Sequence, residues 1–343
     1  MIGDSRQAKL QRLTQFLVRR DFAAAQDVLR ASGTSAPAAS EAIDAAAAVN
    51  AIDAPPPEST IASPAHATIL APALQSPDQP IVLAKVCPGT EAVARSLWDS
   101  DRPGSPAAPK CWLIRRLLPE IMPDHGTITG LYASILRGSR QRFDELEASK
   151  GLCHVASSRP EDLLFMDIET CGLAGTAIFL VGVMFYEEPT LVFEQYLARD
   201  YAEEPAILRL FANRLEQAGV LVTFNGKSFD MNQIRERSTF HALDLFDGKG
   251  PPHLDLLQES RRAWRGSVPN CRLQTLEKHF CGRRRVGDIP GWAIPDAYHQ
   301  FVASNDARQV RDIIHHNTLD LLTMAQLLCA LLTGSGPLAD AQV

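Results

Sequence analysis

The sequence predicts an α/β protein in which a mixed β-sheet is flanked by helices, preceded by a short helical N-terminus and a disordered linker. Two observations carry this prediction. Three apolar segments joined by short connections span residues 163–197, as in a meander. Helical and strand patterns then alternate up to residue 332, which is typical of a sheet covered by helices.

The N-terminal part of the chain lacks this regularity. Residues 1–31 predict a helical segment, because Leu10, Leu13 and Leu17 recur at helical spacing. Residues 32–110 are rich in Ala, Pro and Ser and poor in bulky apolar side chains, so burial offers too little to offset the entropy of ordering. They predict a disordered linker.

Three further units follow this linker. Residues 111–160 are expected to form a small ordered lead-in, although "CWLIRRLLPEIMP" at its start fits a strand or a helix. Residues 161–334 form the main domain, and residues 335–343 form a tail.

Apolar runs and helical spacing assign the elements of the main domain. Ile207 and Phe211 share one helix face, and Gly219 is well placed to end that helix. Residues 253–264 fit a short strand or a helix start. The predicted strands are 163–170, 177–186, 190–197 and 220–225, and the predicted helices are 203–219, 229–243 and 306–332.

Composition excludes some classes of protein. A formal net charge of −6 and a pI near 5.9 argue against general coating of nucleic acid by charge, so any polyanion site is local. No run of eighteen apolar residues occurs, and the N-terminus lacks the apolar core and cleavage site of a secretory signal. We therefore expect a cytoplasmic protein that does not enter a membrane.

Two acids interrupt the apolar segment "LLFMDIET". In a strand, Asp167 and Glu169 project to one face and Ile168 projects to the other. Two ionised carboxylates in a buried site cost several kcal/mol unless cations or hydrogen bonds compensate, and Mg²⁺ accepts such ligands directly. The alternative is a strand end from which both acids protrude into solvent.

Further acids weigh against that alternative. Asp230 follows the strand predicted at 220–225, and sites in open sheets lie beyond the carboxyl ends of strands. Asp320 lies on the last predicted helix, with His316 four residues before it on the same face. Four acids and a histidine favour a shared metal site.

These residues resemble a known family. "LLFMDIETCGL", "VLVTFNGKSFD" and "HHNTLDLLTMAQLL" are similar to the ExoI, ExoII and ExoIII motifs of the DEDD exonucleases, a branch of the RNase H-like fold. With "HLDLL", "CRLQTLE" and "GDIPG" between them, residues 161–333 resemble the predicted bacterial nucleases called YprB-like. The resemblance implies a 3′→5′ exonuclease that hydrolyses phosphodiester bonds of single-stranded DNA or RNA.

The resemblance also implies a ligand set. Asp167, Glu169, Asp230 and Asp320 would hold two Mg²⁺ or Mn²⁺ ions about 4 Å apart. One ion would lower the pKa of the attacking water, and the other would stabilise the leaving oxygen.

The general base departs from the family pattern. Relatives carry a tyrosine four residues before the last aspartate or a histidine five before it, whereas here both positions are histidine. A continuous helix turns His315 away from Asp320, so His316 is the predicted base and His315 the second candidate. The alternative is that either histidine only caps or packs.

Other residues are candidates for supporting roles. The resemblance places Thr170 and Gly172 where similar exonucleases hold the substrate 3′ end. Asn225 and Lys227 are candidates for contact with phosphate or sugar, although Lys227 also fits a solvated surface lysine. Asp255 resembles a recurring acid of the family, or it only holds neighbouring groups.

A basic stretch lies between these motifs. Residues 261–285 contain eight Lys and Arg residues and one acid, Glu277, which suggests a surface that tracks phosphates. Trp264 is a candidate stacking platform for bases. The alternative is an ordinary solvated face.

Two other functions remain open. One is a catalytically silent RNase H-like module that binds nucleic acid, although all four acids are intact. The other is a scaffold in which residues 1–31 and the linker bind a protein partner. The scaffold role is compatible with nuclease activity.

Overall fold

A computed structural model describes residues 80–94, 109–122, 125–139, 149–172, 175–243, 245 and 250–337. The helical segment predicted at 1–31, most of the predicted linker and most of the tail lie outside these residues. In the described part of the chain, no helix combines the length and apolar character needed to cross a membrane.

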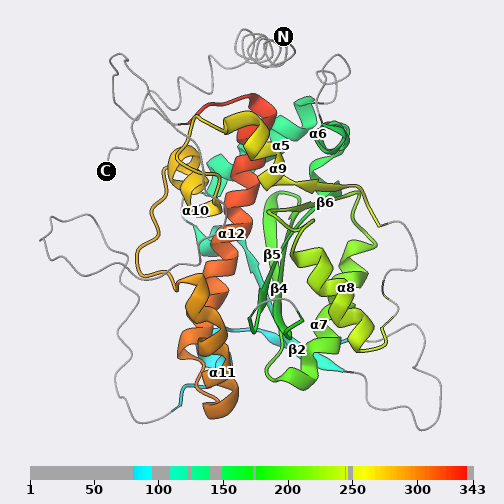
Figure 1. Ribbon diagram of the computed structural model, residues 1–343, viewed down its shortest axis with the longest axis vertical. Helices are drawn as coiled ribbons and strands as arrows, with labels where there is room; N and C mark the ends of the chain where they lie inside the picture. Colours follow the sequence, from blue (N-terminus) through cyan, green and yellow to red (C-terminus); the bar gives the residue numbers. More distant parts are fainter. Residues whose placement is uncertain are drawn as a thin grey trace, which may run out of the picture. The chain divides into compact units, whose positions relative to one another are not determined.

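A seven-stranded mixed sheet forms the centre of the fold, in the order β1-β2-β5-β4-β3-β6-β7 (Figure 1). Strands β1 to β5 pair antiparallel. Strand β6 pairs parallel with β3, and β7 pairs parallel with β6. The predicted meander and mixed sheet are confirmed. The bounds are β1 Thr90–Val93, β2 Lys110–Leu117, β3 Leu163–Thr170, β4 Ile178–Glu187, β5 Thr190–Leu197, β6 Val220–Thr223 and β7 His253–Asp255.

Helices connect the strands and cover both faces of the sheet. They are α3 Leu83–Val86, α4 Leu118–Ile121, α5 His125–Ser139, α6 Lys150–Ala156, α7 Glu204–Leu215, α8 Asp230–Phe240, α9 Leu256–Trp264, α10 Leu273–Leu276, α11 Ile294–Ser304 and α12 Arg308–Thr333. Short 3₁₀ turns span Pro160–Asp162, Tyr201–Glu203 and Gly291–Ala293, and a π-helical turn spans Glu277–Cys281.

The predicted boundary between linker and lead-in is wrong at residues 80–94. This segment contains α3 and β1, and β1 pairs with β2. The predicted lead-in is not separate either, because β2 pairs with β5 of the same sheet. β1 is a four-residue edge strand that depends on pairing with a distant segment, and local composition carries no sign of such a partner.

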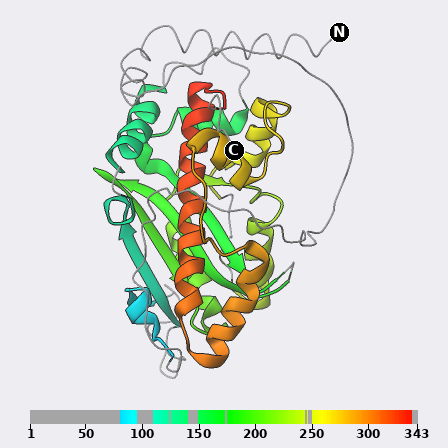
Figure 2. The same ribbon diagram turned by 90° about the vertical axis from the view of Figure 1, so that its left-hand side faces the viewer.

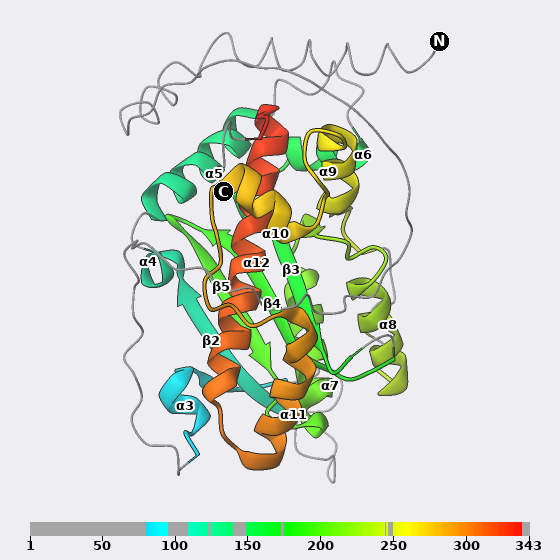
Figure 3. The same ribbon diagram turned by 60° about the vertical axis from the view of Figure 1, so that its left-hand side comes forward.

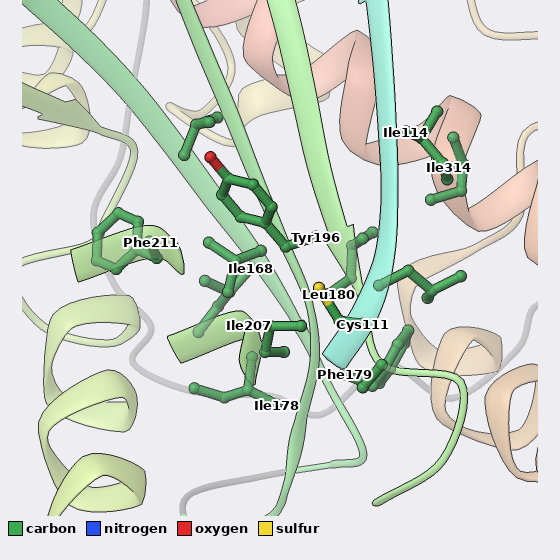
Figure 4. Close-up of a cluster of buried hydrophobic side chains, with 14 of the residues drawn as sticks. Cys111, Ile114, Ile168, Ile178, Phe179, Leu180, Tyr196, Ile207, Phe211 and Ile314 are labelled. Carbon is green, nitrogen blue, oxygen red and sulfur yellow. The ribbon is translucent and has the colours of Figure 1, made fainter. Parts of the chain in front are cut away.

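The sheet separates two helical layers. Helix α12 runs across one face (Figures 2 and 3). On the other side of β3, Ile168 belongs to the same buried cluster as Ile207 and Phe211 of α7 (Figure 4). Full burial of such a side chain stabilises the fold by roughly 1.5–3 kcal/mol. The alternation along β3 therefore anchors Ile168 in the α7 layer and leaves its neighbours to face α12.

Candidate active site

Strand β3 presents Asp167 and Glu169 toward α12. Asp167 Oδ2 accepts a hydrogen bond of 2.9 Å from Asn317 Nδ2 on that helix. Glu169 shares the face because strand side chains alternate. The two acids lie on the face opposite Ile168, as their spacing predicts.

Asn317 reaches Asp167 by lying across Gly182. Gly182 is the register partner of Asp167 on β4, and a Cβ added to it would overlap Asn317 Oδ1. Gln195 Nε2 donates to the same oxygen at 2.8 Å, so the amide of Asn317 is fixed with its nitrogen toward Asp167. Sequence analysis missed these three residues. The signal was a lone glycine within an apolar strand, which indicates close approach of another group.

Replacing Gly182 by Ala is expected to destabilise the protein by about 1–3 kcal/mol, because the added methyl group must displace Asn317. Urea unfolding measures this change in the free energy of unfolding. Gly250→Ala is the matched control, since an added Cβ there meets nothing within 4 Å. Equal midpoints for the two variants would contradict the close approach.

Asp230 enters the site from the start of α8. It is buried, and its carboxylate accepts hydrogen bonds from its own backbone N–H and from that of Ile168. The second bond joins the beginning of α8 to β3 beside the first two acids. Burial raises the pKa of Asp230 to about 7, although these two donors lower it.

Helix α12 supplies the fourth acid and a histidine. His316 Nε2 lies 3.5 Å from Asp320 Oδ2, as a spacing of four residues on one helix requires. His316 is buried, whereas His315 is exposed and contacts none of the four acids in the described part of the chain. The geometry therefore brings His316, and not His315, into the cluster.

The four acids perturb one another. Burial, followed by repulsion from Asp320, Glu169 and Asp230, raises the pKa of Asp167 well above its ordinary value. Burial also raises the pKa of Glu169 to about 8, although nearby His316 lowers it. Perturbations of this kind are typical of functional sites.

Arg285 opposes this charge at one point. Its Nη2 lies 2.5 Å from Asp320 Oδ1, and its Nε lies 2.6 Å from Glu277 Oε2. Burial still raises the pKa of Asp320, although Arg285 lowers it. One guanidinium therefore serves Asp320 and the buried Glu277 together, and sequence analysis did not connect it with the site.

The basic stretch divides into inward and outward residues. Arg283 and Arg285 turn inward and pair with Glu277. The prediction of a stacking platform at Trp264 is wrong: this side chain is buried and stacks on Phe280 with ring centroids 3.8 Å apart. Trp264 lies on the buried face of α9, together with Leu257 and Ser260. The arginines that remain exposed are Arg261, Arg262, Arg265, Arg272 and Arg284.

The connection after β6 holds Asn225 and Lys227, and Asp255 at the end of β7 contacts both. Asp255 Oδ1 accepts from Asn225 N at 2.9 Å, and its Oδ2 accepts from Lys227 N at 3.2 Å. Asp255 thereby shapes the turn that precedes Asp230, which fits the alternative of holding neighbouring groups. The side chains of Asn225 and Lys227 are exposed and hydrogen-bond to none of the four acids within the described ranges.

The residues after β3 form a tight turn. Thr170 Oγ1 donates to Gly172 O at 2.6 Å, and Gly172 adopts a φ of 148°, a conformation that favours glycine. The turn begins one residue beyond Glu169. It therefore lies next to the acids, and its contact with a substrate end stays a prediction.

The donor set fits a divalent cation in charge and chemistry. Four carboxylates lie close enough to repel one another, only Asp320 among them pairs with the Arg285 guanidinium in the described part of the chain, and hard cations prefer oxygen ligands. Across the described residues, no group of three or more His, Cys, Asp or Glu side chains is already arranged to hold a metal ion. Asn317 holds the carboxylate of Asp167, and Arg285 holds that of Asp320.

Fold and sequence together define the class of this domain. Residues 164–332 match the family model of the RNase H superfamily and form an RNase H-like domain. Over 197 residues the chain is 33% identical to the uncharacterized protein YprB of Bacillus subtilis (strain 168), and the domain is YprB-like. The alignment covers 54% of this chain and 48% of that protein, so the chain spans about half the length of this curated relative.

A solved structure is also similar. The family B DNA polymerase from the hyperthermophilic archaeon Pyrobaculum calidifontis aligns with a TM-score of 0.38 and 15% identity. The match covers 50% of this chain and 27% of the polymerase.

Proposed function

We propose that this protein is a divalent-metal-dependent nuclease, a 3′→5′ exonuclease of single-stranded nucleic acid. One observation carries the proposal: Asp167, Glu169, Asp230 and Asp320 converge from β3, α8 and α12 into one cluster of raised pKa. Mutual repulsion of four carboxylates destabilises the fold, so their placement together indicates a function. The RNase H-like class of the domain supports a reaction at phosphodiester bonds.

The four acids are the proposed ligands of two Mg²⁺ or Mn²⁺ ions. When bound, such ions lower the pKa of water and stabilise charge on the leaving oxygen. Asn317 holds the Asp167 carboxylate in a fixed orientation through its 2.9 Å hydrogen bond. The hydrogen bond from Ile168 does the same for Asp230, so the ligands start from defined positions.

His316 is the proposed general base. Its Nε2 faces the acid cluster at Asp320, and the site requires a proton acceptor there as water attacks phosphorus. Burial lowers the pKa of His316, but the hydrogen bond to Asp288 and the charges of Asp320 and Glu169 together outweigh it, and the net shift is upward. Bound cations would offset the carboxylate charge and return the imidazole toward the neutral form that accepts a proton.

Substrate contacts are proposed at the edges of the cluster. The turn at Thr170 and Gly172 would hold the 3′ end, and exposed Asn225 and Lys227 would meet phosphate or sugar. The exposed arginines of α9 and the following loop offer a local basic surface on a net acidic chain. A protein partner for residues 1–31 stays a prediction.

The histidine assignment is tested by single substitutions. His316→Gln is expected to lower kcat by about 10²–10⁴-fold, and His315→Gln is expected to leave it within about twofold. Steady-state hydrolysis of a single-stranded oligonucleotide measures both. Loss of turnover in His315→Gln alone would reverse the assignment.

The activity itself is tested with end-labelled linear and circular single strands of DNA and RNA. We expect a ladder of products from linear strands with Mg²⁺ or Mn²⁺, no product with EDTA, and no cutting of circles. Cleaved circles would show an endonuclease. Binding of single strands without hydrolysis under any metal condition would support the silent RNase H-like module instead.

A further inference from the structure

The "GDIPG" segment, residues 287–291, lies beside the proposed base. Asp288 Oδ2 is 2.9 Å from His316 Nδ1, across 28 residues of sequence. The side chains of Asp288 and His316 are each only 9% exposed, so water competes little for this contact. Nothing in the proposed ligand set accounts for an acid at this position.

The contact specifies which histidine nitrogen carries the proton. Arg285 Nη1 also donates to Asp288 Oδ2, at 3.2 Å. Burial raises the pKa of Asp288, but the hydrogen bonds from His316 and Arg285 lower it by more, so the net shift is downward. An ionised carboxylate only accepts hydrogen bonds, so His316 Nδ1 must carry a hydrogen. The neutral ring then presents an unprotonated Nε2 toward Asp320.

Arg285 couples this contact to the acid cluster. Its two terminal nitrogens bridge Asp288 and Asp320, one on each side of His316. Its Nε is held by Glu277, which Thr323 and Arg283 also contact. The bridge fixes the loop that carries Asp288 against α12, so Asp288 and Asp320 stand at opposite nitrogens of one imidazole.

The second carboxylate oxygen argues against a purely structural role. Asp288 Oδ1 is buried and has no hydrogen-bond partner in the described part of the chain. An unpartnered buried acceptor costs about 1–3 kcal/mol, so this carboxylate is not optimal for stability. Its other oxygen, Oδ2, instead takes both hydrogen bonds, one from Arg285 and the shorter one from His316.

We propose that Asp288 is the positioning residue of His316: it accepts the Nδ1 hydrogen and directs a free Nε2 into the acid cluster. The inference rests on the proposed function, because it assigns His316 its orientation as the base. It gives the "GDIPG" segment a role in the site. No contact of Asp288 with substrate is needed.

The first test separates orientation from binding. Asp288→Asn keeps the size of the side chain, but its amide cannot hold His316 in one form. We expect kcat to fall by about 10²–10⁴-fold and KM to stay within about threefold. Asp296→Asn, an exposed acid eight residues further on, is the matched control and should match wild type. Unchanged kcat in Asp288→Asn, with the wild type active, would overturn the inference.

The second test asks whether Asp288 acts through His316. In a double-mutant cycle with His316→Gln, adding Asp288→Asn should lower kcat by less than about twofold. A full multiplicative loss would show that Asp288 works independently of His316. Thermal unfolding of all variants excludes general loss of the fold as the cause.

The third test does not need activity. Long-range ¹H–¹⁵N NMR of the histidine rings, recorded above the pKa of His316, distinguishes the Nδ1–H form from the Nε2–H form. We expect the Nδ1–H form in wild type and a mixture in Asp288→Asn. An Nε2–H form in wild type would overturn the inference. A different result is that wild type hydrolyses no nucleic acid while His316 still changes from the Nδ1–H form in wild type to a mixture in Asp288→Asn. In that case the proposed function fails, and the role of Asp288 in orienting His316 stands.

Discussion

Replacing Asp230 by Asn is expected to lower the hydrolysis rate by about 10³-fold or more while raising the stability of the metal-free protein. The rate falls because a neutral amide is a poor ligand for a hard cation. Stability rises because burial, with repulsion from Asp255 and Asp320, outweighs the hydrogen bonds to Asp230 and raises its pKa to about 7, so at pH 8 the ionised carboxylate is an unfavourable buried charge. Single-turnover hydrolysis and thermal unfolding in EDTA measure the two effects.

Glu236→Gln provides the control for this substitution. Glu236 is an exposed acid on α8, six residues after Asp230, and its loss should change neither quantity beyond error. A stability gain without an activity loss would show that Asp230 is strained but unused. A loss of both activity and stability in Asp230→Asn would contradict the electrostatic account, because it would indicate a structural requirement for the charge.

The metal-free protein is expected to lose stability as pH rises from about 4 to about 8. Glu169 and Asp230 have ordinary pKa values of 4.5 and 3.8, and the fold raises them to about 8 and about 7. The folded state therefore binds more protons than the unfolded state in this window, and the slope of stability against pH is negative. The stabilisation that comes from proton binding by Glu169 and Asp230 is fully present below their ordinary pKa values. It is lost once the pH exceeds their raised pKa values.

Divalent cations should reverse this trend. We expect Mg²⁺ at millimolar concentration to raise Tm at pH 8 by about 5 °C or more and to have little effect at pH 5, where protons occupy the ligands. Differential scanning calorimetry in EDTA and in Mg²⁺ measures both curves. Asp230→Asn should flatten the EDTA curve. A Mg²⁺ effect of the same size at pH 5 and pH 8 would place the ion elsewhere.

The sheet and the site acids were largely predictable from sequence because their signals are local. Strand β3 was predicted with its observed bounds, and the two-residue spacing of Asp167 and Glu169 requires a shared face. The four-residue spacing of His316 and Asp320 likewise requires proximity on a helix. Each inference depends only on the side-chain periodicity of a single strand or helix.

The residues that hold the site were not predictable, because they depend on contacts between distant segments. Asn317 reaches Asp167 across 150 residues of sequence, and only the lone glycine at position 182 hinted at this approach. Arg285 lay within a basic stretch that suggested an exposed surface, yet it is buried against acids. Whether a charged side chain turns inward depends on partners that spacing does not reveal.

The most direct test of the central claim compares wild type with Asp167→Ala on an end-labelled single strand in Mg²⁺ or Mn²⁺. Asp167 is the acid with contacts to β4 and α12 and with charge coupling to the other three. We predict metal-dependent hydrolysis by wild type and a loss of about 10³-fold or more in the variant. Equal rates in the two proteins would contradict assignment of nuclease activity to this site.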